Sequence, residues 1–328
     1  GETGKKCQQE CKQYCVEVGI HYACLLWRRR AKIPKLVILR PVISFKMKLS
    51  IFNITDFRVD GGAMFGVIPK ALWSRQVPSD ENNTIELSLN SLVIETDGRV
   101  ILVDAGWGDK QDEKFFRHAY LHGGAGLLGG LAQCGYSPED VTDVIITHLH
   151  ADHCGGCFAN APGGGTTAIF PNASYHISRE QWEWANESNL REEDAFLPEN
   201  IKPFSESGRL NLIEDNGELC PGVMLRICYG HTPGLMVPVI RYGERNFIYA
   251  GDLMPTTAHI SLLWNMAYDL LPLVTIAEKQ EILEEGLRDE SVLIFQHDPQ
   301  TECCALAETP KGIRAGVRGR LTDFLQTS

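Results

Sequence analysis

The sequence lacks several features that would assign it to a specialised class of protein. None of its 328 residues fall in an apolar run of about 18 residues, so we expect no transmembrane helix. Basic residues are fewer than acidic residues, with 31 Lys and Arg against 42 Asp and Glu. The net charge of −11 disfavours a nucleic-acid surface, because phosphate binding needs clustered positive charge. No internal repeat or low-complexity linker follows residue 47. With 44% hydrophobic and 22% charged residues, the composition is typical of a globular protein with a sizeable core.

Cysteine is present, but its placement does not indicate disulfides. Four of the 11 cysteines lie in the first 24 residues, and the other seven are scattered from Cys134 to Cys304. A chain of this length does not need disulfides to fold, and an odd number of scattered cysteines fits a reducing compartment. We therefore expect free thiols and a cytoplasmic location.

Residues 1–46 differ from the rest of the chain in charge. They carry ten Lys or Arg against three Glu, which leaves 21 basic and 39 acidic residues, a net charge of −18, in residues 47–328. Such a break marks a tail or a boundary. We expect residues 1–46 to be a basic N-terminal extension outside the core, and residues 47–328 to form a single domain that starts naturally at Met47. Alternatively, Cys7, Cys11 and Cys15 would line one helix face and bind a metal.

Short β-rich segments alternate with helical patterns from Met47 onward. The hydrophobic alternation over 85–97, the Asp97-Gly98 pair and the apolar run that follows predict a hairpin, because Asp-Gly readily adopts positive φ. The other patterns predict strands at 47–54, 143–147, 223–230, 237–243, 246–252 and 291–298, and helices at 112–120, 127–135, 177–186 and 276–289. Strands outnumber helices and occur in two clusters, which favours a layered α/β sandwich over a doubly wound parallel sheet.

Several predicted strands end in residues that can bind a metal. The strand at 143–147 leads into HLHADH at 148–153, and His231, Asp252 and His297 each follow a later strand. Ligands at strand ends are held by a rigid sheet, while the loops leave an open face for a substrate. Zn²⁺ favours imidazole with carboxylate, and two ions about 3.5–4 Å apart can share a carboxylate and a hydroxide. These residues therefore indicate a metal site with room for two ions.

The segment His148-Leu149-His150-Ala151-Asp152-His153 matches the HxHxDH signature of the metallo-β-lactamase superfamily. Three further elements follow in the order of that superfamily, namely GHTPG at 230–234, AGD at 250–252 and His297 after a strand, while VDAG at 103–106 resembles an early strand-to-loop motif. The resemblance covers most of residues 47–300. It implies a four-layer αββα sandwich of the α/β class, with a dinuclear metal site at its open edge.

The resemblance also implies which residues bind the metals. By position, one ion would be held by His148, His150 and His231, the other by Asp152, His153 and His297, and Asp252 would bridge the two.

The residues beside these ligands have other expected roles. We expect Asp104 to orient a histidine of the site rather than to bind metal. Gly155 and Gly156 would serve backbone geometry. Cys154 and Cys157 would pack beneath the loop rather than act as thiolate ligands.

Two further segments resemble one branch of the superfamily. Residues 61–73 and 252–269 are similar to the branch that contains methyl parathion hydrolase and the larger quorum-quenching N-acyl-homoserine lactone lactonases. We expect an apolar, substrate-binding wall for an acyl chain, formed by Met64, Phe65, Trp73, Met266 and Tyr268. The alternative is that the first three are ordinary core residues.

One departure from the smaller lactonases concerns a tyrosine that contacts the substrate carbonyl shortly after the bridging aspartate. Residues 255–257 are Pro-Thr-Thr here, so no tyrosine inherits that role by position. His259 is the expected catalytic donor in its place, and Tyr268 is a second choice. Leu235 stands where many relatives have a histidine, so we expect the contact that this histidine makes behind the metal ligands to be missing as well.

The function implied by the resemblance is the opening of the lactone ring of N-acyl-homoserine lactones. A hydroxide that bridges two divalent metal ions would attack the ring carbonyl, with Asp152 or Asp252 moving the proton. Zinc is the expected metal, and Mn, Fe and Co are alternatives. Superfamily membership does not define the substrate, so an organophosphate triesterase is the main alternative, followed by a thioesterase and a non-catalytic metal-binding protein. We expect a small-molecule substrate, no nucleic-acid or membrane partner, and a homodimer, since dimers are common in the branch.

Overall fold

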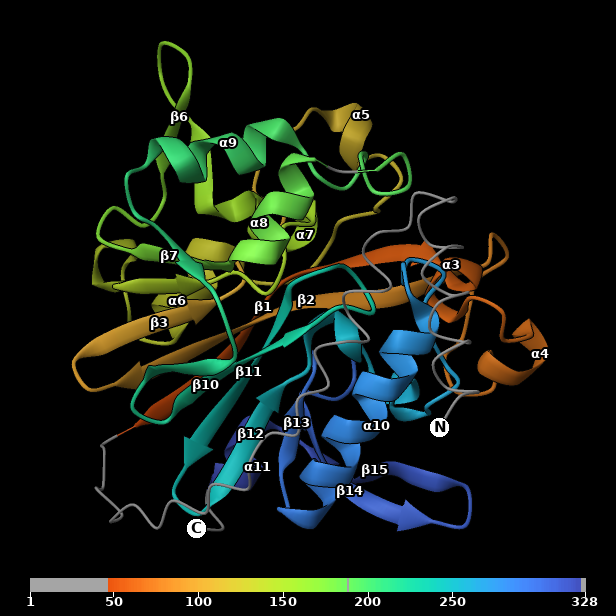
Figure 1. The fold of residues 1–328 in the computed structure, drawn as a ribbon. Coiled ribbons are helices and arrows are strands. Elements are labelled where there is room, and N and C mark those ends of the chain that lie inside the picture. The colour runs from red at the N-terminus through yellow and green to blue at the C-terminus, as the bar shows by residue number, and fades with distance from the viewer. Residues whose placement is uncertain (1–46, 188, 326–328) are drawn as a thin grey trace, which may run out of the picture. The chain divides into compact units, whose positions relative to one another are not determined.

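The computed structural model describes residues 47–187 and 189–325. The predicted N-terminal extension, with its alternative cysteine metal site, lies outside the described residues. Two mixed sheets face each other, and helices lie on the outer face of each one (Figure 1). This arrangement is the predicted αββα sandwich.

The first sheet begins as an antiparallel hairpin and continues as parallel strands. Its order is β1 (Lys48–Asp60), β2 (Thr84–Thr96), β3 (Arg99–Val103), β4 (Asp143–Ile145), β7 (Ser174–Ser178) and β8 (Leu210–Ile213). The predicted turn between β2 and β3 is confirmed, since Asp97 and Gly98 have φ values of +49° and +73°.

The second sheet carries the C-terminal half of the chain. Its order is β15 (Gly312–Gly319), β14 (Cys303–Thr309), β13 (Val292–Ile294), β12 (Arg245–Tyr249), β11 (Leu235–Tyr242), β10 (Val223–Cys228) and β9 (Gly217–Cys220). A separate ribbon pairs β5 (Phe158–Asn160) with β6 (Thr166–Ala168). Within the second sheet β12 and β13 run parallel, so the residues that follow them emerge at the same edge.

The helices are mostly short and lie outside the sheets. They are α3 (Gly61–Phe65), α4 (Lys70–Trp73), α5 (Glu113–Phe116), α6 (Leu127–Gln133), α7 (Ala151–Cys154), α8 (Arg179–Asn186), α9 (Pro198–Glu206), α10 (Pro272–Arg288) and α11 (Leu321–Leu325). Four of them agree in position with the helices predicted from sequence. The helix predicted at 112–120 shortens to α5, because the backbone of Ala119 and His122 bonds to the edge strand β1 instead.

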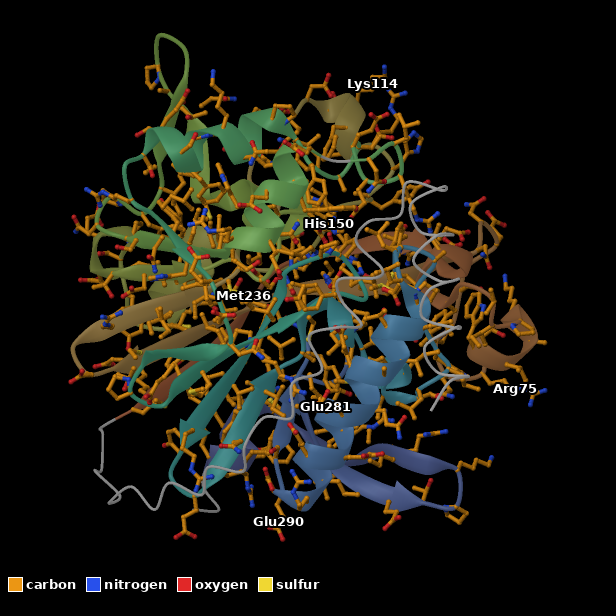
Figure 2. The ribbon with its side chains drawn as sticks, in the orientation of Figure 1. Arg75, Lys114, His150, Met236, Glu281 and Glu290 are labelled. Carbon is orange, nitrogen blue, oxygen red and sulfur yellow. The ribbon has the colours of Figure 1, made fainter. Side chains whose placement is uncertain are left out.

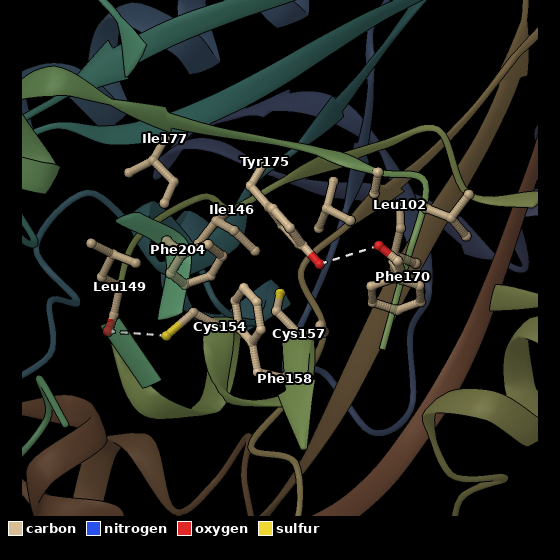
Figure 3. Close-up of a cluster of buried hydrophobic side chains, with 14 of the residues drawn as sticks. Leu102, Ile146, Leu149, Cys154, Cys157, Phe158, Phe170, Tyr175, Ile177 and Phe204 are labelled. Atoms are coloured by element: carbon tan, nitrogen blue, oxygen red, sulfur yellow. Dashed lines mark hydrogen bonds between the residues drawn. The ribbon is translucent and has the colours of Figure 1, made fainter. Parts of the chain in front are cut away.

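Three buried apolar clusters hold the layers together. Ile94 and Ile145 of the first sheet share the central cluster with Phe247 of the second. Side chains of α6, α8 and α9 cover the outer face of the first sheet, where Tyr175 and Phe204 pack together (Figure 3). Helix α10 covers the second sheet through residues 282 and 283. Each sheet is therefore apolar on both faces, as an inner layer requires.

The thiols agree with the sequence-based expectation. Seven cysteines lie in the described part of the chain, all are free, and six of these are buried. The cytoplasmic location inferred from them stays a prediction. Within residues 47–325, apart from 188, no helix is both long and apolar enough to cross a membrane.

Candidate metal centre

Five imidazoles and two carboxylates meet at one edge of the sandwich. Residues 148–153 follow β4 of the first sheet, whereas His231, Asp252 and His297 follow β10, β12 and β13 of the second. Figure 2 shows His150 near the centre of the molecule, in contrast to Lys114 and Glu290 at its periphery. The strand ends of both sheets thus bring together all seven residues that were predicted as metal ligands.

The seven side chains form two groups. In the first, His148, His150, His231 and Asp252 each offer one atom, and in the second Asp152, His153 and His297 do so; the atoms of a group lie within 4.8 Å of one another. The six residues other than Asp252 divide as the family resemblance implies, and Asp252 is grouped with the first set.

Asp252 faces both groups. Its Oδ2 lies 3.3 Å from His231 Nε2, and its Oδ1 lies 2.9 Å from His297 Nε2. A carboxylate in this position offers one oxygen to each of two ions.

The donor atoms fit divalent metal ions. His150 Nδ1 lies 3.0 Å from His148 Nε2 and 3.3 Å from His231 Nε2, so three imidazole nitrogens lie close enough together to share one ion. Burial lowers the pKa of His148 well below its usual value, so its imidazole is neutral and free to bind a cation. The buried atoms His153 Nε2 and Asp252 Oδ1 have no hydrogen bond of normal geometry. Because buried polar atoms are nearly always satisfied, this arrangement fits two bound cations of the zinc type.

Each imidazole is held through the ring nitrogen that faces away from the site. The contacts join His148 Nδ1 to Thr147 Oγ1 (3.1 Å), His150 Nε2 to Glu192 Oε1 (3.2 Å), His153 Nδ1 to Asp104 Oδ2 (3.0 Å), His231 Nδ1 to Asp269 Oδ1 (3.0 Å), and His297 Nδ1 to the Ser88 carbonyl oxygen (2.9 Å). Such contacts select which nitrogen faces the metal and fix the ring orientation.

Asp104 has the orienting position that the sequence predicted. It is fully buried, and beside His153 it accepts hydrogen bonds from the Thr147 backbone N–H and hydroxyl, both at 2.8 Å. Its backbone has a φ of +57°, which is uncommon for a residue with a side chain. The carboxylate therefore joins the end of β3 to the ligand loop that follows β4.

The electrostatics of the second group keep its charges paired. Burial alone would lower the pKa of His153, but the carboxylates of Asp152 and Asp252 outweigh it and raise that pKa well above its usual value. Burial would raise the pKa of Asp252, yet His297 and His153 hold it well below its usual value. The side chains of Asp152 and Asp252 are 22% and 11% exposed, whereas that of His153 is fully covered. The two carboxylates are thus accessible from solvent.

Close backbone approach explains the two glycines after the ligand loop. A Cβ at Gly155 would lie 2.0 Å from the Trp107 carbonyl oxygen, and one at Gly156 would lie 2.1 Å from that of Ala105. As expected, these glycines serve backbone geometry.

The two cysteines that flank these glycines pack beneath the loop. Cys154 and Cys157 are fully buried in the apolar cluster of Figure 3, where burial raises the pKa of both thiols. The Cys154 thiol donates to the Leu149 carbonyl oxygen at 3.4 Å. Neither cysteine belongs to the groups of metal-binding atoms, as predicted from the sequence.

The residues predicted to line the substrate site lie beside the metal centre but are largely buried. Met64, Phe65, Trp73 and Met266 share one apolar cluster and are 0–4% exposed, whereas Tyr268 is 46% exposed. The cluster reaches the metal centre through Phe57, whose ring lies 5.6 Å from that of His297. The first four side chains pack as core residues, and substrate contact by all five stays a prediction.

His259, the predicted catalytic donor, already has protein partners on both nitrogens. Nε2 lies 2.8 Å from the Met64 carbonyl oxygen, Nδ1 lies 2.8 Å from Thr256 Oγ1, and the ring stacks on Phe65. Burial lowers its pKa to about 4, so the ring is neutral at pH 7. This geometry suits a group that fixes α3, and its catalytic role stays a prediction.

Sequence reasoning did not assign the partners of His150 and His231. Asp269 is the last residue of segment 252–269, which resembles the lactonase branch, and that resemblance is the sequence feature that could have identified Asp269 as a site residue. Glu192 lies in the acidic run Glu192-Glu193-Asp194, where nothing in the sequence distinguishes it from its neighbours.

Comparison with known proteins agrees with the geometry. Residues 85–297 match the Metallo-beta-lactamase superfamily. An N-acyl homoserine lactonase from Bacillus cereus is 31% identical over 236 residues, which cover 67% of this chain and 85% of the relative. A crystal structure from Staphylococcus aureus, described as "a probable metal-dependent hydrolase", aligns with a TM-score of 0.76 at 30% identity, over 83% of this chain and 97% of the other. AidC, described as a dizinc quorum-quenching lactonase, shares the fold with a TM-score of 0.69 at 20% identity, over 85% and 97% of the two chains. The chain therefore belongs to the metallo-β-lactamase superfamily and is one of its metal-dependent hydrolases.

Proposed function

We propose that the protein hydrolyses the lactone ring of N-acyl-homoserine lactones. The observation that carries the proposal is the position of Asp252 between two groups of imidazoles, in a chain 31% identical to an N-acyl homoserine lactonase. AidC, a dizinc quorum-quenching lactonase whose structure holds a product, supports the proposal through its similar fold.

Two divalent metal ions, with zinc as the proposed metal, would occupy the two groups. His148, His150 and His231 would hold one ion, Asp152, His153 and His297 the other, and Asp252 would contact both. When bound, such ions polarise a carbonyl and make water nucleophilic at neutral pH.

A carboxylate of the chain would transfer the proton of the attacking water to the leaving oxygen. Asp252 has both oxygens directed at the imidazole groups, which leaves Asp152, the more exposed of the two, to accept a proton from the attacking water. Asp152 would then return that proton to the ring oxygen as the carbonyl–oxygen bond breaks. The product is the ring-opened hydroxy acid, and one water is consumed.

The substrate would be oriented by Tyr268 and the neighbouring apolar cluster. Partial burial raises the pKa of Tyr268, and the nearby carboxylates of Asp152 and Asp252 raise it further, so the phenol stays protonated and can donate to the substrate carbonyl. The acyl chain would lie against the cluster that contains Met64 and Met266. His259 would hold this wall in place through the Met64 carbonyl.

Acid release from a long-chain N-acyl-homoserine lactone tests the proposal on zinc-loaded protein. We expect ring opening that is lost on chelation, restored by zinc, and absent from the variants His148→Ala and Asp252→Ala. Paraoxon and an acyl thioester measured on the same preparation separate the alternatives. Lactone turnover no faster than in the two variants, or slower than paraoxon turnover, would contradict the proposal. Light scattering on the same sample tests the homodimer implied by the resemblance.

A further inference from the structure

Glu192 is a buried carboxylate in the segment that joins α8 to α9. It is 5% exposed, while its neighbours Arg191 and Glu193 are exposed. Burial of a carboxylate is costly unless it is paired and hydrogen-bonded. Glu192 meets this condition, since Oε1 lies 3.2 Å from His150 Nε2 and Oε2 accepts from Trp184 Nε1 at 2.7 Å and from Asn189 Nδ2 at 3.1 Å.

These contacts fix the orientation of His150. With Nε2–H donating to Glu192, the lone pair of Nδ1 faces His148 and His231, at the first group of metal-binding atoms. The ring of Phe196 lies 5.0 Å from that of His150. Two buried residues from one segment therefore hold the His150 ring.

The same segment also contacts the loop that carries Asp269, the partner of His231. Hydrogen bonds from Ala195 N and Phe196 N to the Glu192 carbonyl oxygen fold residues 189–196 into turns. The Arg191 guanidinium donates to the Ala267 carbonyl oxygen, two residues before the partner of His231. The segment thus spans from His150 to the loop that orients His231.

We propose that Glu192 is a positioning residue that couples metal binding at the first group to the order of residues 189–196. The carboxylate makes the His150 ring a stronger donor through Nδ1, and an ion on Nδ1 makes Nε2–H a stronger hydrogen-bond donor. Because coupling between two sites is reciprocal, an ion that is held more tightly by the ordered segment also orders that segment. The inference rests on the metal binding in the proposed function and is independent of the substrate.

Three variants test this coupling. Glu192→Ala removes the carboxylate, Glu192→Gln keeps its shape without its charge, and Glu193→Gln is a matched control on the exposed neighbour. Zinc affinity is measured by competition with a chromophoric chelator. We expect the first two variants to bind one of the two ions about 10- to 100-fold less tightly, with the smaller loss in Glu192→Gln, and the control to match the wild type.

Hydrogen exchange of residues 189–196, with and without zinc, provides a readout that does not depend on activity. In the wild type and in Glu193→Gln, zinc should slow exchange in this segment; in Glu192→Ala the effect should disappear while exchange in α10 is unchanged. Should Glu192→Ala fail to fold, Glu192→Gln decides the question. The proposal would be overturned if Glu192→Gln bound zinc as tightly as the wild type and zinc slowed hydrogen exchange in residues 189–196 of that variant to the same extent. Failure of lactone hydrolysis in the wild type would contradict the proposed function and leave this result unaffected.

Discussion

Replacing Asp104 with asparagine should weaken metal binding at the group formed by Asp152, His153 and His297. The Asp104 carboxylate accepts three hydrogen bonds, two from Thr147 and one from His153 Nδ1. Asparagine keeps the shape but puts an NH₂ group where one acceptor oxygen was. In one orientation this group faces the Thr147 N–H, and in the other it faces the His153 N–H, so one donor is always opposed by another donor.

The size of the effect follows from the bonds that are lost. A hydrogen bond to a charged group contributes about 1.5–3 kcal/mol, and loss of such a partner behind a metal ligand typically lowers metal affinity about 10- to 100-fold. That range corresponds to about 1.4–2.8 kcal/mol. Zinc titration against a chromophoric chelator should show one ion of the two weakened by this factor, and the other changed little.

Asp143 provides a matched control. It forms a second buried Asp–His pair, with His176 Nε2 at 2.7 Å, but at the start of β4 rather than beyond its end. Asp143→Asn should lower the free energy of unfolding and leave both zinc affinities unchanged. Equal losses of zinc affinity in both variants would show that the affinity falls through general destabilisation of the fold and not through the orientation of His153. No loss in Asp104→Asn would refute the reasoning directly.

Two further predictions concern packing and pH. Gly155→Ala places a Cβ 2.0 Å from the Trp107 carbonyl oxygen and should cost roughly 1–3 kcal/mol of unfolding free energy in urea. Gly129 lies in α6, and a Cβ there would lie 3.9 Å from its nearest neighbour, the Ala125 Cβ, so Gly129→Ala should gain roughly 0.5–1 kcal/mol. Equal tolerance of both changes would contradict the close approach at Gly155. Burial lowers the pKa of Lys279 to about 7 from its usual 10.5, so the unfolded chain binds more protons between these pH values and stability should rise with pH across that window. Lys279→Met should flatten the rise measured by denaturant unfolding at pH 7–10, and an equally steep profile in that variant would contradict the assignment.

The meeting of the candidate metal ligands could be predicted from sequence because two constraints act together. The HLHADH run has a fixed spacing, and the later residues each follow an apolar strand. Strands that run parallel end at one edge of a sheet, which brings Asp252 and His297 together although 44 residues separate them. The glycines and Asp104 could be predicted for the same reason, since they lie beside these strand ends.

Other features could not be predicted, for physical reasons that differ. Glu192 lies in a segment of turns without periodicity, so burial of its carboxylate depends on tertiary contacts alone. A substrate wall and a packed core both require apolar side chains, so the pattern around Met64 and Phe65 did not distinguish them. The helix expected at 112–120 lost its second half to hydrogen bonds with β1, a partner more than 50 residues away.

The ligands come from both sheets, and this has a consequence for the lifetime of the protein. Ions bound here would join loops of the two sheets, from His148 to His297, across the open edge of the sandwich. A ligand that binds only the folded chain stabilises it by mass action. While the free ion concentration stays well above the dissociation constant, each tenfold fall in that concentration therefore raises the unfolded fraction of the protein about tenfold for one bound ion. For two bound ions the rise is about a hundredfold. The supply of metal in the cell would thus control how much of this protein survives proteolysis, in addition to how fast it turns over substrate.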